Sequence, residues 1–409
     1  INLKKDYGNG IIEADGKGYY AYLPAVFIYQ DLNFRFFYDI ERVKYASPNL
    51  YYNYLRTHNN RIINKYYAGT ALAMLPFYLA GHAITLIAGS DADGYSYWYT
   101  LMVHIGALFY LLMGVLAIQK LLRLYCISEK YIAFTLGAIV FGTNLFYYTA
   151  VEFSMSHVYS FAFIAWFVYL AKRYFEKPDP AFIIIAAFLL GIIAFIRPVN
   201  VIVVASLPFI AGSRGKLYDG ISFLVRHKIT LVTGILAAVL IGGLQLLIYK
   251  LQTGDFIVYS YQGEGFNFLK PHIGAVLFSY RKGLFLYTPL LLFSLAGLLL
   301  LYRKSRFSAL MLLIFLVLLT YMISSWHMWF YGGSFSQRVF IDFFVFFAVM
   351  LALTYQELKP AALRKAYIVA TFVLVLFCQF QTYQYRHMII HWSDMTKEMY
   401  WEAMFKLPK

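Results

Sequence analysis

The sequence predicts an all-α polytopic membrane protein, and two observations support this fold class. The first is composition: of 409 residues, 61% are hydrophobic, 20% aromatic and only 13% charged, whereas a soluble domain is about 45–50% apolar and about 25% charged. The second is that apolar runs of about 17–25 residues recur along the chain, which is the length that a helix needs to cross a bilayer. Helices satisfy their own backbone hydrogen bonds in lipid, so a helical bundle is expected.

Ten apolar runs fit membrane spans. Pro198 separates two short runs at "FIRPVN", because proline interrupts a helix and restricts the residue before it. We expect the spans at 98–119, 130–149, 157–172, 181–196, 198–212, 229–250, 284–302, 307–325, 338–356 and 364–382.

Charge predicts the orientation of these spans. Basic segments such as "QKLLRLYCISEK", "KRYFEK" and "YRKSR" fall in every second loop, which the positive-inside rule places in the cytoplasm. The alternate loops, around Glu152, Arg197, 251–283 and 326–337, then face outward. The net charge of +15 is explained mostly by these short basic loops. No soluble domain carries a basic stripe with stacking aromatics, so no nucleic-acid partner is expected.

Residues 66–89 form a further apolar run with two interpretations. A proline and a glycine interrupt it and Lys65 precedes it, so we expect an amphipathic helix lying at the outer interface, with a further span before the first residue. A plain transmembrane helix would instead place the first 65 residues in the cytoplasm. The expected division is a first outer loop at 1–97, a transmembrane bundle at 98–382 and a short outward tail at 383–409.

Several ionisable residues on the outward side are not explained by the positive-inside rule. Charged groups at membrane depth are costly and usually functional. Carboxylates and cations that converge from separate spans indicate an anionic, lipid-linked substrate handled at the outer leaflet. The set is Glu13, Asp15, Lys17, Lys65, Glu152, His157, Arg197, Arg281, Lys282 and Arg338.

Six segments, in their order and on their common outward side, resemble the membrane glycosyltransferases of the GT-C fold: "EADGKGYYAYLPA", "NKYYAGTALAMLPFYLAGH", "VEFSMSHVYSF", "FIRPVN", "SYRKGLFLYTPLLL" and "WFYGGSFSQRVFIDFF". The chain is similar to bacterial protein O-mannosyltransferases and the lipid A aminoarabinose transferase. The resemblance implies a bundle of about ten or eleven transmembrane helices, with juxtamembrane helices in the first outer loop. It also implies an inverting enzyme of the bacterial inner membrane, which moves a sugar from a polyprenyl-phosphate donor to an acceptor hydroxyl on the periplasmic face.

Asp15 stands where this family has an aspartate early in the first outer loop. By the resemblance, it accepts the proton of the acceptor hydroxyl or orients that hydroxyl, and Gly16 and Gly18 let the backbone approach the substrate. The alternative is an Asp-Gly turn at the interface. Glu13 is the second candidate acid, although some relatives place the two acids side by side. Its alternative is a solvated carboxylate.

Five cations are candidates for holding the donor phosphate, where negative charge grows as the sugar leaves. Arginine binds phosphate through paired hydrogen bonds and lysine as a point charge. Lys65 matches the family's phosphate-contacting lysine, although Tyr66 follows it where the family has proline. Each cation has an alternative as an interfacial side chain reaching lipid headgroups, and the arginine of "FIRPVN" needs a partner, either phosphate or a carboxylate. The other four cations are Arg197, Arg281, Lys282 and Arg338.

Five further residues are candidates for lining the substrate cavity: Tyr19, Tyr20, Glu152, His157 and His327. The resemblance also allows a divalent cation, Mg or Mn, held by Asp15 and Glu152. The alternatives are a helix-start cap by Ser154 or Ser156 and an interfacial aromatic belt.

The absence of several motifs limits the class of sugar donor that is expected. The sequence has no Walker loop, no G-x-G-x-x-G after a strand, no H-E-x-x-H and no cytoplasmic domain for a nucleotide sugar. A donor taken from the membrane is therefore expected, with a protein, a lipid or a glycan as acceptor. The alternatives are a glycan polymerase or ligase, a non-catalytic subunit, and a transporter or flippase of a lipid-linked sugar, which would show inverted repeats or paired broken helices.

Overall fold

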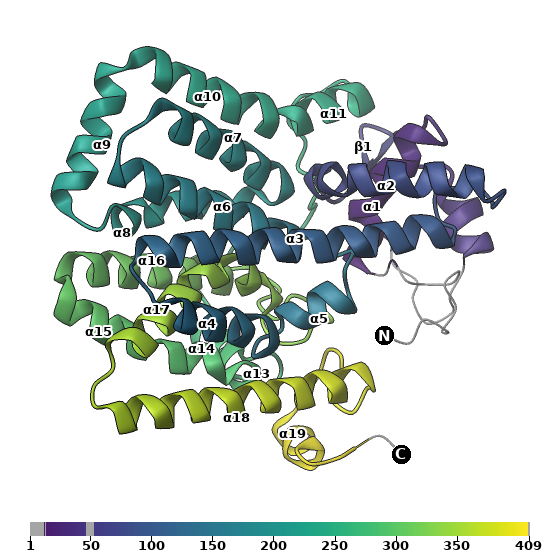
Figure 1. Ribbon diagram of the computed structural model, residues 1–409. Coiled ribbons are helices and arrows are strands. Elements are labelled where there is room, and N and C mark those ends of the chain that lie inside the picture. Colours follow the sequence, from purple (N-terminus) through teal and green to yellow (C-terminus); the bar gives the residue numbers. More distant parts are fainter. Residues whose placement is uncertain (1–11, 13, 46–52, 408–409) are drawn as a thin grey trace.

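The computed structural model describes residues 12, 14–45 and 53–407, and nearly all of their regular structure is helical. Figure 1 shows most of the helices running side by side along one direction, with the N-terminal segment gathered at one end of this bundle.

The N-terminal segment combines helices with one short hairpin, whose two strands pair antiparallel with Leu55 opposite Asn64. Asn64 Nδ2 donates to Gly18 O at 2.7 Å, which ties the hairpin to the first helix. Gly18 permits this contact, because a Cβ there would lie 2.3 Å from the Tyr66 ring. The elements are α1 (Asp15–Phe27), η1 (Phe37–Lys44), β1 (Leu55–His58), β2 (Arg61–Asn64) and α2 (Gly69–Ile87).

Each of the ten expected apolar runs is helical, and some are interrupted. Pro198 starts a 3₁₀ helix and Pro289 starts a new α-helix, as expected for a residue that fits only the first turn. The elements are α3 (Tyr97–Leu124), α4 (Glu129–Phe141), α5 (Leu145–Ala150), α6 (His157–Glu176), α7 (Pro180–Ile196), η2 (Pro198–Ser206), α8 (Leu207–Ala211), α9 (Arg214–Arg226), α10 (Lys228–Gly242), α11 (Leu244–Thr253), α12 (Ile273–Phe278), α13 (Leu284–Tyr287), α14 (Pro289–Ser294), α15 (Ala296–Lys304), α16 (Arg306–Ser324), η3 (Arg338–Phe343), α17 (Phe344–Glu357), α18 (Ala361–Arg386) and α19 (Lys397–Ala403).

Among the described residues, six helical segments are long and apolar enough to cross a membrane. They are Gly69–Ile87, Tyr97–Leu124, Lys228–Thr253, Arg306–Ser324, Arg338–Glu357 and Ala361–Arg386. The chain is therefore an integral membrane protein. The larger count of about ten or eleven spans stays a prediction.

α2 runs along the first half of α3 in the opposite direction (Figure 1). Tyr110 OH donates to Ala73 O at 3.0 Å, and a Cβ on Gly81 would lie 3.0 Å from Tyr99 Cα. Both interpretations of residues 66–89, the interfacial helix and the transmembrane helix, stay predictions. The hairpin before α2 nevertheless lies beside a loop that was expected to face outward.

The loops divide between the two ends of the bundle as the charge pattern predicts. At one end, which we call the basic end, Lys304 lies 3.1 Å from Glu357, and Ser128 N donates to Gln356 at 3.2 Å. The basic end comprises residues 120–130, 172–179, 212–228, 302–306 and 357–365. The opposite end, which we call the site end, comprises the described residues 12, 14–45, 53–66, 142–157, 197–200, 254–283, 326–342 and 383–404.

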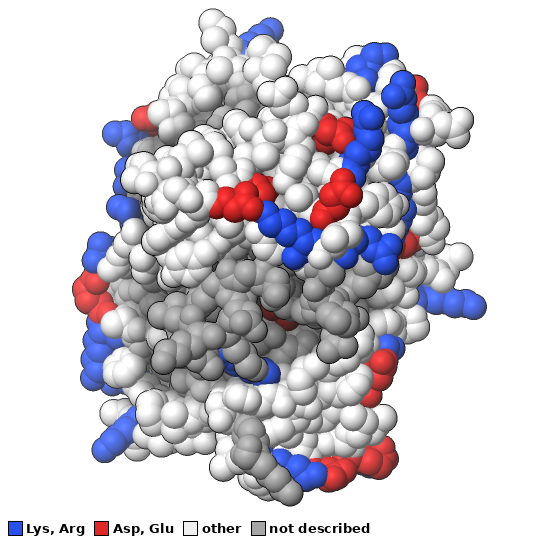
Figure 2. Space-filling view, turned by 90° about the vertical axis from the view of Figure 1, so that its right-hand side faces the viewer, with Lys and Arg blue, Asp and Glu red and all other residues white. Residues whose placement is uncertain are grey.

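The site end is held together by contacts between distant parts of the chain. His58 Nε2 lies 3.1 Å from Asp255 Oδ2 in the 254–272 loop. Figure 2 looks onto this end and shows Lys and Arg side chains next to Asp and Glu. Both signs of charge therefore occur on one face.

α17 is the central helix. Of the apolar window in Arg338–Glu357, 94% is buried inside the protein, as expected for a helix that is hydrophobic all round. The 3₁₀ helix η3 leads directly into it. Arg338 and Asp342 on η3 are thus attached to the most buried element of the fold.

Candidate functional site

Asp15, at the start of α1, pairs with Arg338, at the start of η3. Arg338 Nη2 donates to Asp15 Oδ2, and Tyr66 OH donates to Asp15 Oδ1 at 2.7 Å. The Asp15 side chain is 18% exposed and the Arg338 side chain 9%, so little water screens the attraction between their charges. Such a pair is costly to bury and marks a candidate site.

The backbone next to this pair departs from ordinary conformations. The φ angle is 47° at Ala14, 53° at Tyr331 and 58° at Ser336, which is the left-handed region that L residues other than glycine rarely adopt. Gly16 meets a different demand, because a Cβ there would lie 2.1 Å from Ser154 Oγ. Strained residues of this kind cluster at ligand sites.

Asp342 is the centre of a second buried group on the same 3₁₀ helix. His157 Nδ1 lies 2.8 Å from its Oδ1, Asn200 Nδ2 donates to its Oδ2 at 2.6 Å, and Arg197 Nε lies 3.7 Å from Oδ2. Asn200 also donates to Ser160 Oγ at 2.7 Å. Asp342 is therefore the carboxylate partner that Arg197 requires, and it holds a guanidinium and an imidazole at the site end.

Neither Asp342 nor Asn200 is among the residues predicted from the sequence. Asp342 lies inside an apolar run interpreted as a span, close after Arg338. An acidic residue inside such a run is the signal that points to it, because charge in a span is rare and usually functional. Asn200 follows Pro198 in "FIRPVN" and gives a weaker signal of the same kind.

Tyr19 and Tyr331 connect the two groups. Burial, and then the charge of Asp15, raises the pKa of Tyr19. Arg197 and Arg338 act on the same phenol in the opposite direction. Burial also raises the pKa of Tyr331, and the same two arginines oppose that rise. Since each phenol lies within range of both guanidiniums, the two ion pairs belong to one site.

Lys282 is a buried amine whose acceptors are backbone carbonyls. Its Nζ donates to Ser334 O and to Trp392 O, the latter at 2.6 Å. Burial lowers the pKa of Lys282 to about 7, while the charge of Glu152 opposes this effect and that of Arg338 adds to it. Lys282 therefore links the C-terminal tail to the loop before Arg338 and adds a cation near the two ion pairs.

Two of the predicted phosphate ligands pair with carboxylates of neighbouring segments. Arg281 pairs with Asp394 of the tail, and its guanidinium lies 3.4 Å from the centre of the Phe330 ring. Lys65 Nζ lies 2.6 Å from Glu264 Oε1. The structure thus gives both cations a role in joining loops of the site end.

The remaining predicted residues are placed differently from one another. A tyrosine hydroxyl donates to Glu152 Oε1 at 3.0 Å, within electrostatic reach of Arg338 and Lys282. Tyr20 turns away from the cluster and donates to a backbone carbonyl of the loop after α2. His327 is exposed. Glu13 lies outside the described residues.

The described side chains do not form a cage for Mg or Mn. Both Asp15 oxygens accept hydrogen bonds, from Arg338 and Tyr66. In the part of the chain that the structure describes, no group of three or more His, Cys, Asp or Glu side chains is suited to hold a metal ion. A hard divalent cation needs several oxygen ligands, so the cation expected at Asp15 and Glu152 does not fit this geometry.

Several buried polar atoms near Arg338 have no hydrogen-bond partner among the described residues: Ser336 Oγ, Gln337 Oε1, Arg338 Nε and Asn144 Oδ1. Asn144 is distant in sequence but lies near Arg338, because its Nδ2 donates to Phe335 O at 3.0 Å. Buried polar atoms are almost always paired. These atoms lie beside a buried ion pair. A polar ligand, or ordered water in its place, would supply the hydrogen bonds that they lack.

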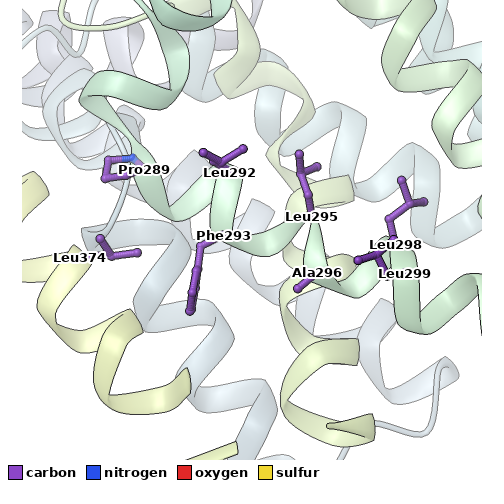
Figure 3. A pocket seen from close by; sticks show the side chains of 8 residues that line it. All are labelled: Pro289, Leu292, Phe293, Leu295, Ala296, Leu298, Leu299 and Leu374. Carbon is purple, nitrogen blue, oxygen red and sulfur yellow. The ribbon is translucent and has the colours of Figure 1, made fainter. Parts of the chain in front are cut away.

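An open apolar groove of about 640 Å³ lies apart from these charges, where α14 and α15 face α18 (Figure 3). Its walls are hydrocarbon, so it suits an alkyl or prenyl chain rather than a polar group. The lining residues are Pro289, Leu292, Phe293, Leu295, Ala296, Leu298, Leu299 and Leu374.

Comparisons with known proteins give one structural likeness. No family model and no curated protein matches the sequence. A solved structure of the archaeal oligosaccharyltransferase AglB from Archaeoglobus fulgidus, in complex with an inhibitory peptide and a dolichol-phosphate, is similar, with 13% identity and a TM-score of 0.46. The match covers 96% of this chain and 54% of AglB, so the chain spans about half the length of that protein. A likeness at this level does not identify an activity.

Proposed function

We propose that the protein is an inverting GT-C glycosyltransferase that moves a sugar from a polyprenyl-phosphate donor to an acceptor hydroxyl at the site end. The observation that carries the proposal is the buried pair of Asp15 and Arg338, a candidate base in contact with a candidate phosphate ligand. The resemblance of the six outward segments supports the same assignment. The site end then faces the periplasm of a bacterial inner membrane, opposite the basic end.

Donor binding begins with an exchange of partners at Arg338. Its Nη2 donates to Asp15, whereas its Nε has no hydrogen-bond partner among the described residues. A phosphate group presents acceptor oxygens that match the guanidinium donors, so it competes with Asp15 for them. Arg197 and Lys282 add positive charge, which stabilises the leaving phosphate as the bond to the sugar breaks.

The exchange activates the base. Without the donor, the Asp15 carboxylate accepts hydrogen bonds from Arg338 and Tyr66 and is engaged by them. Once the phosphate engages Arg338, Asp15 accepts the proton of the acceptor hydroxyl while that oxygen attacks the anomeric carbon. Attack opposite the phosphate inverts this carbon. Asp15 therefore becomes available as the base only when the donor is present.

The apolar groove provides a place for the prenyl chain. Its walls are hydrocarbon, and it begins at Pro289, shortly after Lys282 in the sequence. A prenyl chain along α14 and α15 would place the donor phosphate toward the segment that carries Lys282. Burial of the chain contributes affinity without any polar contact.

Asp15→Asn tests the exchange. Asparagine removes the base and also weakens the hold on Arg338, so transfer should fall by about 10²–10⁴-fold, while the Kd of the donor stays unchanged or decreases. The measurement is transfer of a labelled sugar from a polyprenyl-phosphate donor by protein in nanodiscs, with donor binding measured in parallel. Normal transfer by a well-folded variant would reject the mechanism.

Arg281→Gln is the matched control, because Arg281 lies at the same end but pairs with Asp394 of the tail. It should keep transfer within about threefold of the parent, as partly exposed ion pairs contribute little. If Asp15→Asn instead weakens donor binding as strongly as transfer, the Asp15–Arg338 pair is structural and the exchange is wrong.

A further inference from the structure

α9 is a helix whose direction differs from that of its neighbours. Figure 1 shows it at the basic end, running across the direction of α6 and α10. It joins α8 to α10, and only Gly220 of its residues is buried. Gly220 packs against the end of α6, where Tyr174 OH donates to Gly220 O at 2.6 Å. One line of contact therefore holds α9 to the bundle and leaves most of its surface open.

The open surface of α9 carries an apolar stripe. Tyr218 is 70% exposed, Ile221 52% and Val225 61%. Their spacing of three and then four residues places them along one side of the helix. Exposed apolar side chains in such a row indicate a surface that is covered in the working protein.

Basic residues accompany this stripe. Lys216 pairs with Glu176 of α6, whereas no carboxylate of the described residues pairs with Arg214, Arg226 or Lys228. Asp219 is the one acidic residue of the segment. The exposed cations are Arg214, Lys216, Arg226 and Lys228. An apolar stripe with an excess of cations is typical of a helix that lies on an anionic membrane surface.

The position of the bilayer follows from the next helix. Lys228 begins the candidate span Lys228–Thr253, so the polar headgroup layer at this end lies at the level where α9 ends. Several apolar side chains of α10 are more than half exposed, as expected for a surface in contact with lipid. They include Ile235, Leu236, Val239 and Leu240.

We propose that α9 lies in the headgroup layer at the basic end and binds anionic phospholipids. Tyr218, Ile221 and Val225 enter the boundary between headgroups and acyl chains, while Arg214 and Arg226 contact lipid phosphates. Charge complementarity and the adjoining span select an anionic leaflet over a protein partner as the occupant. The assignment is independent of the glycosyltransferase function proposed above.

A probe on the stripe tests the position of α9. Ile221→Cys carries an environment-sensitive fluorophore in a Cys126→Ser background, because Cys126 is exposed and Cys378 is buried. In nanodiscs, spin-labelled lipids should quench the probe and aqueous iodide should not. Quenching by iodide and not by lipid would overturn the proposal. Protection from both quenchers in native membranes that disappears in nanodiscs would also overturn it, since it would indicate a protein partner.

Lipid selectivity tests the cations. Spin-labelled phosphatidylglycerol should quench the probe more strongly than spin-labelled phosphatidylcholine, and the preference should fall at least about fivefold in Arg214→Gln/Arg226→Gln/Lys228→Gln. Asp219→Asn removes the opposing charge and should increase the preference for phosphatidylglycerol. This gain serves as a control, because misfolding could explain a loss of preference in the triple variant but not a gain. Equal quenching by the two lipids in the parent protein would refute anionic selectivity.

Discussion

The two ends of the bundle carry their charges in different environments. At the basic end, the pairs Arg123–Glu129 and Lys304–Glu357 have side chains that are 38% to 64% exposed. At the site end, Asp342 is fully buried. Charges in water cost little and contribute little, whereas buried charges persist only with fixed partners.

This difference distinguishes charges that set the orientation in the membrane from charges that belong to the candidate site. Most cations of the basic end are explained by the positive-inside rule alone, and the exception is Lys172, which is buried beside Glu176. The site end combines buried carboxylates with buried cations, strained backbone and polar atoms without partners, and orientation explains none of these. The same substitution should therefore have a large effect at the site end and a small one at the basic end.

Arg338→Gln should give the largest effect. It leaves the Asp15 carboxylate buried without its cation, and breaking a buried pair in this way costs about 3–5 kcal/mol of stability. Donor binding should be lost together with transfer. Thermal unfolding in nanodiscs and donor Kd measure the two effects. An unchanged melting temperature would show that the pair is better hydrated than its burial indicates.

Asp342→Asn should rank second. It keeps the shape of the side chain but removes the charge that faces Arg197 and His157, and hydrogen bonds to charged groups contribute about 1.5–3 kcal/mol each. Asp342 is a positioning residue in this mechanism, so kcat should fall more than donor Kd rises. Asp342→Glu, which restores the charge, should recover part of kcat. A loss of stability with unchanged kinetics would limit Asp342 to a structural role.

Lys282 should give a moderate effect that depends on pH. Its pKa of about 7 means that the amine loses its charge as the pH passes through neutrality, so the donor KM should rise above about pH 7. Lys282→Arg stays protonated and should abolish this rise. The native pKa is lower than the unfolded one, so this group makes stability increase between about pH 7 and about pH 10. A flat KM profile in the parent would contradict the assignment.

Arg123→Gln at the basic end should give the smallest effect. The side chain is half exposed and its pair with Glu129 is surrounded by solvent, so neither the melting temperature nor the transfer rate should change measurably. A loss comparable to that of Arg338→Gln would remove the distinction between the two ends.

The helices could be predicted from the sequence because apolarity alone decides which segments leave water. The run expected at 181–196 is the helix Pro180–Ile196, and that expected at 307–325 is Arg306–Ser324. The run expected at 130–149 is interrupted after Phe141. This interruption lies beside Asn144, whose side chain donates to Phe335 O, and a contact with so distant a segment leaves no local trace in composition.

The residue types of the site were also predictable, but their pairing was not. Charge patterning placed Asp15 and Arg338 at the same end, where the structure joins them. It also suggested Arg281 as a phosphate ligand, whereas the tail folds back and supplies Asp394 to it. Asp342 was missed because its neighbours are apolar. Pairing depends on which loops meet, and loop contacts are set by the packing of the whole bundle.

The attachment of Arg338 to α17 has a consequence for how the protein is made. Asp15 and Arg338 are 323 positions apart, so the N-terminal carboxylate is synthesised long before its cation. Insertion of α17, the central helix, also delivers Arg338 and Asp342, which precede it on η3. Assembly of the bundle and maturation of the site are therefore one event, and a nascent chain that stops before α17 has neither a finished core nor a neutralised Asp15.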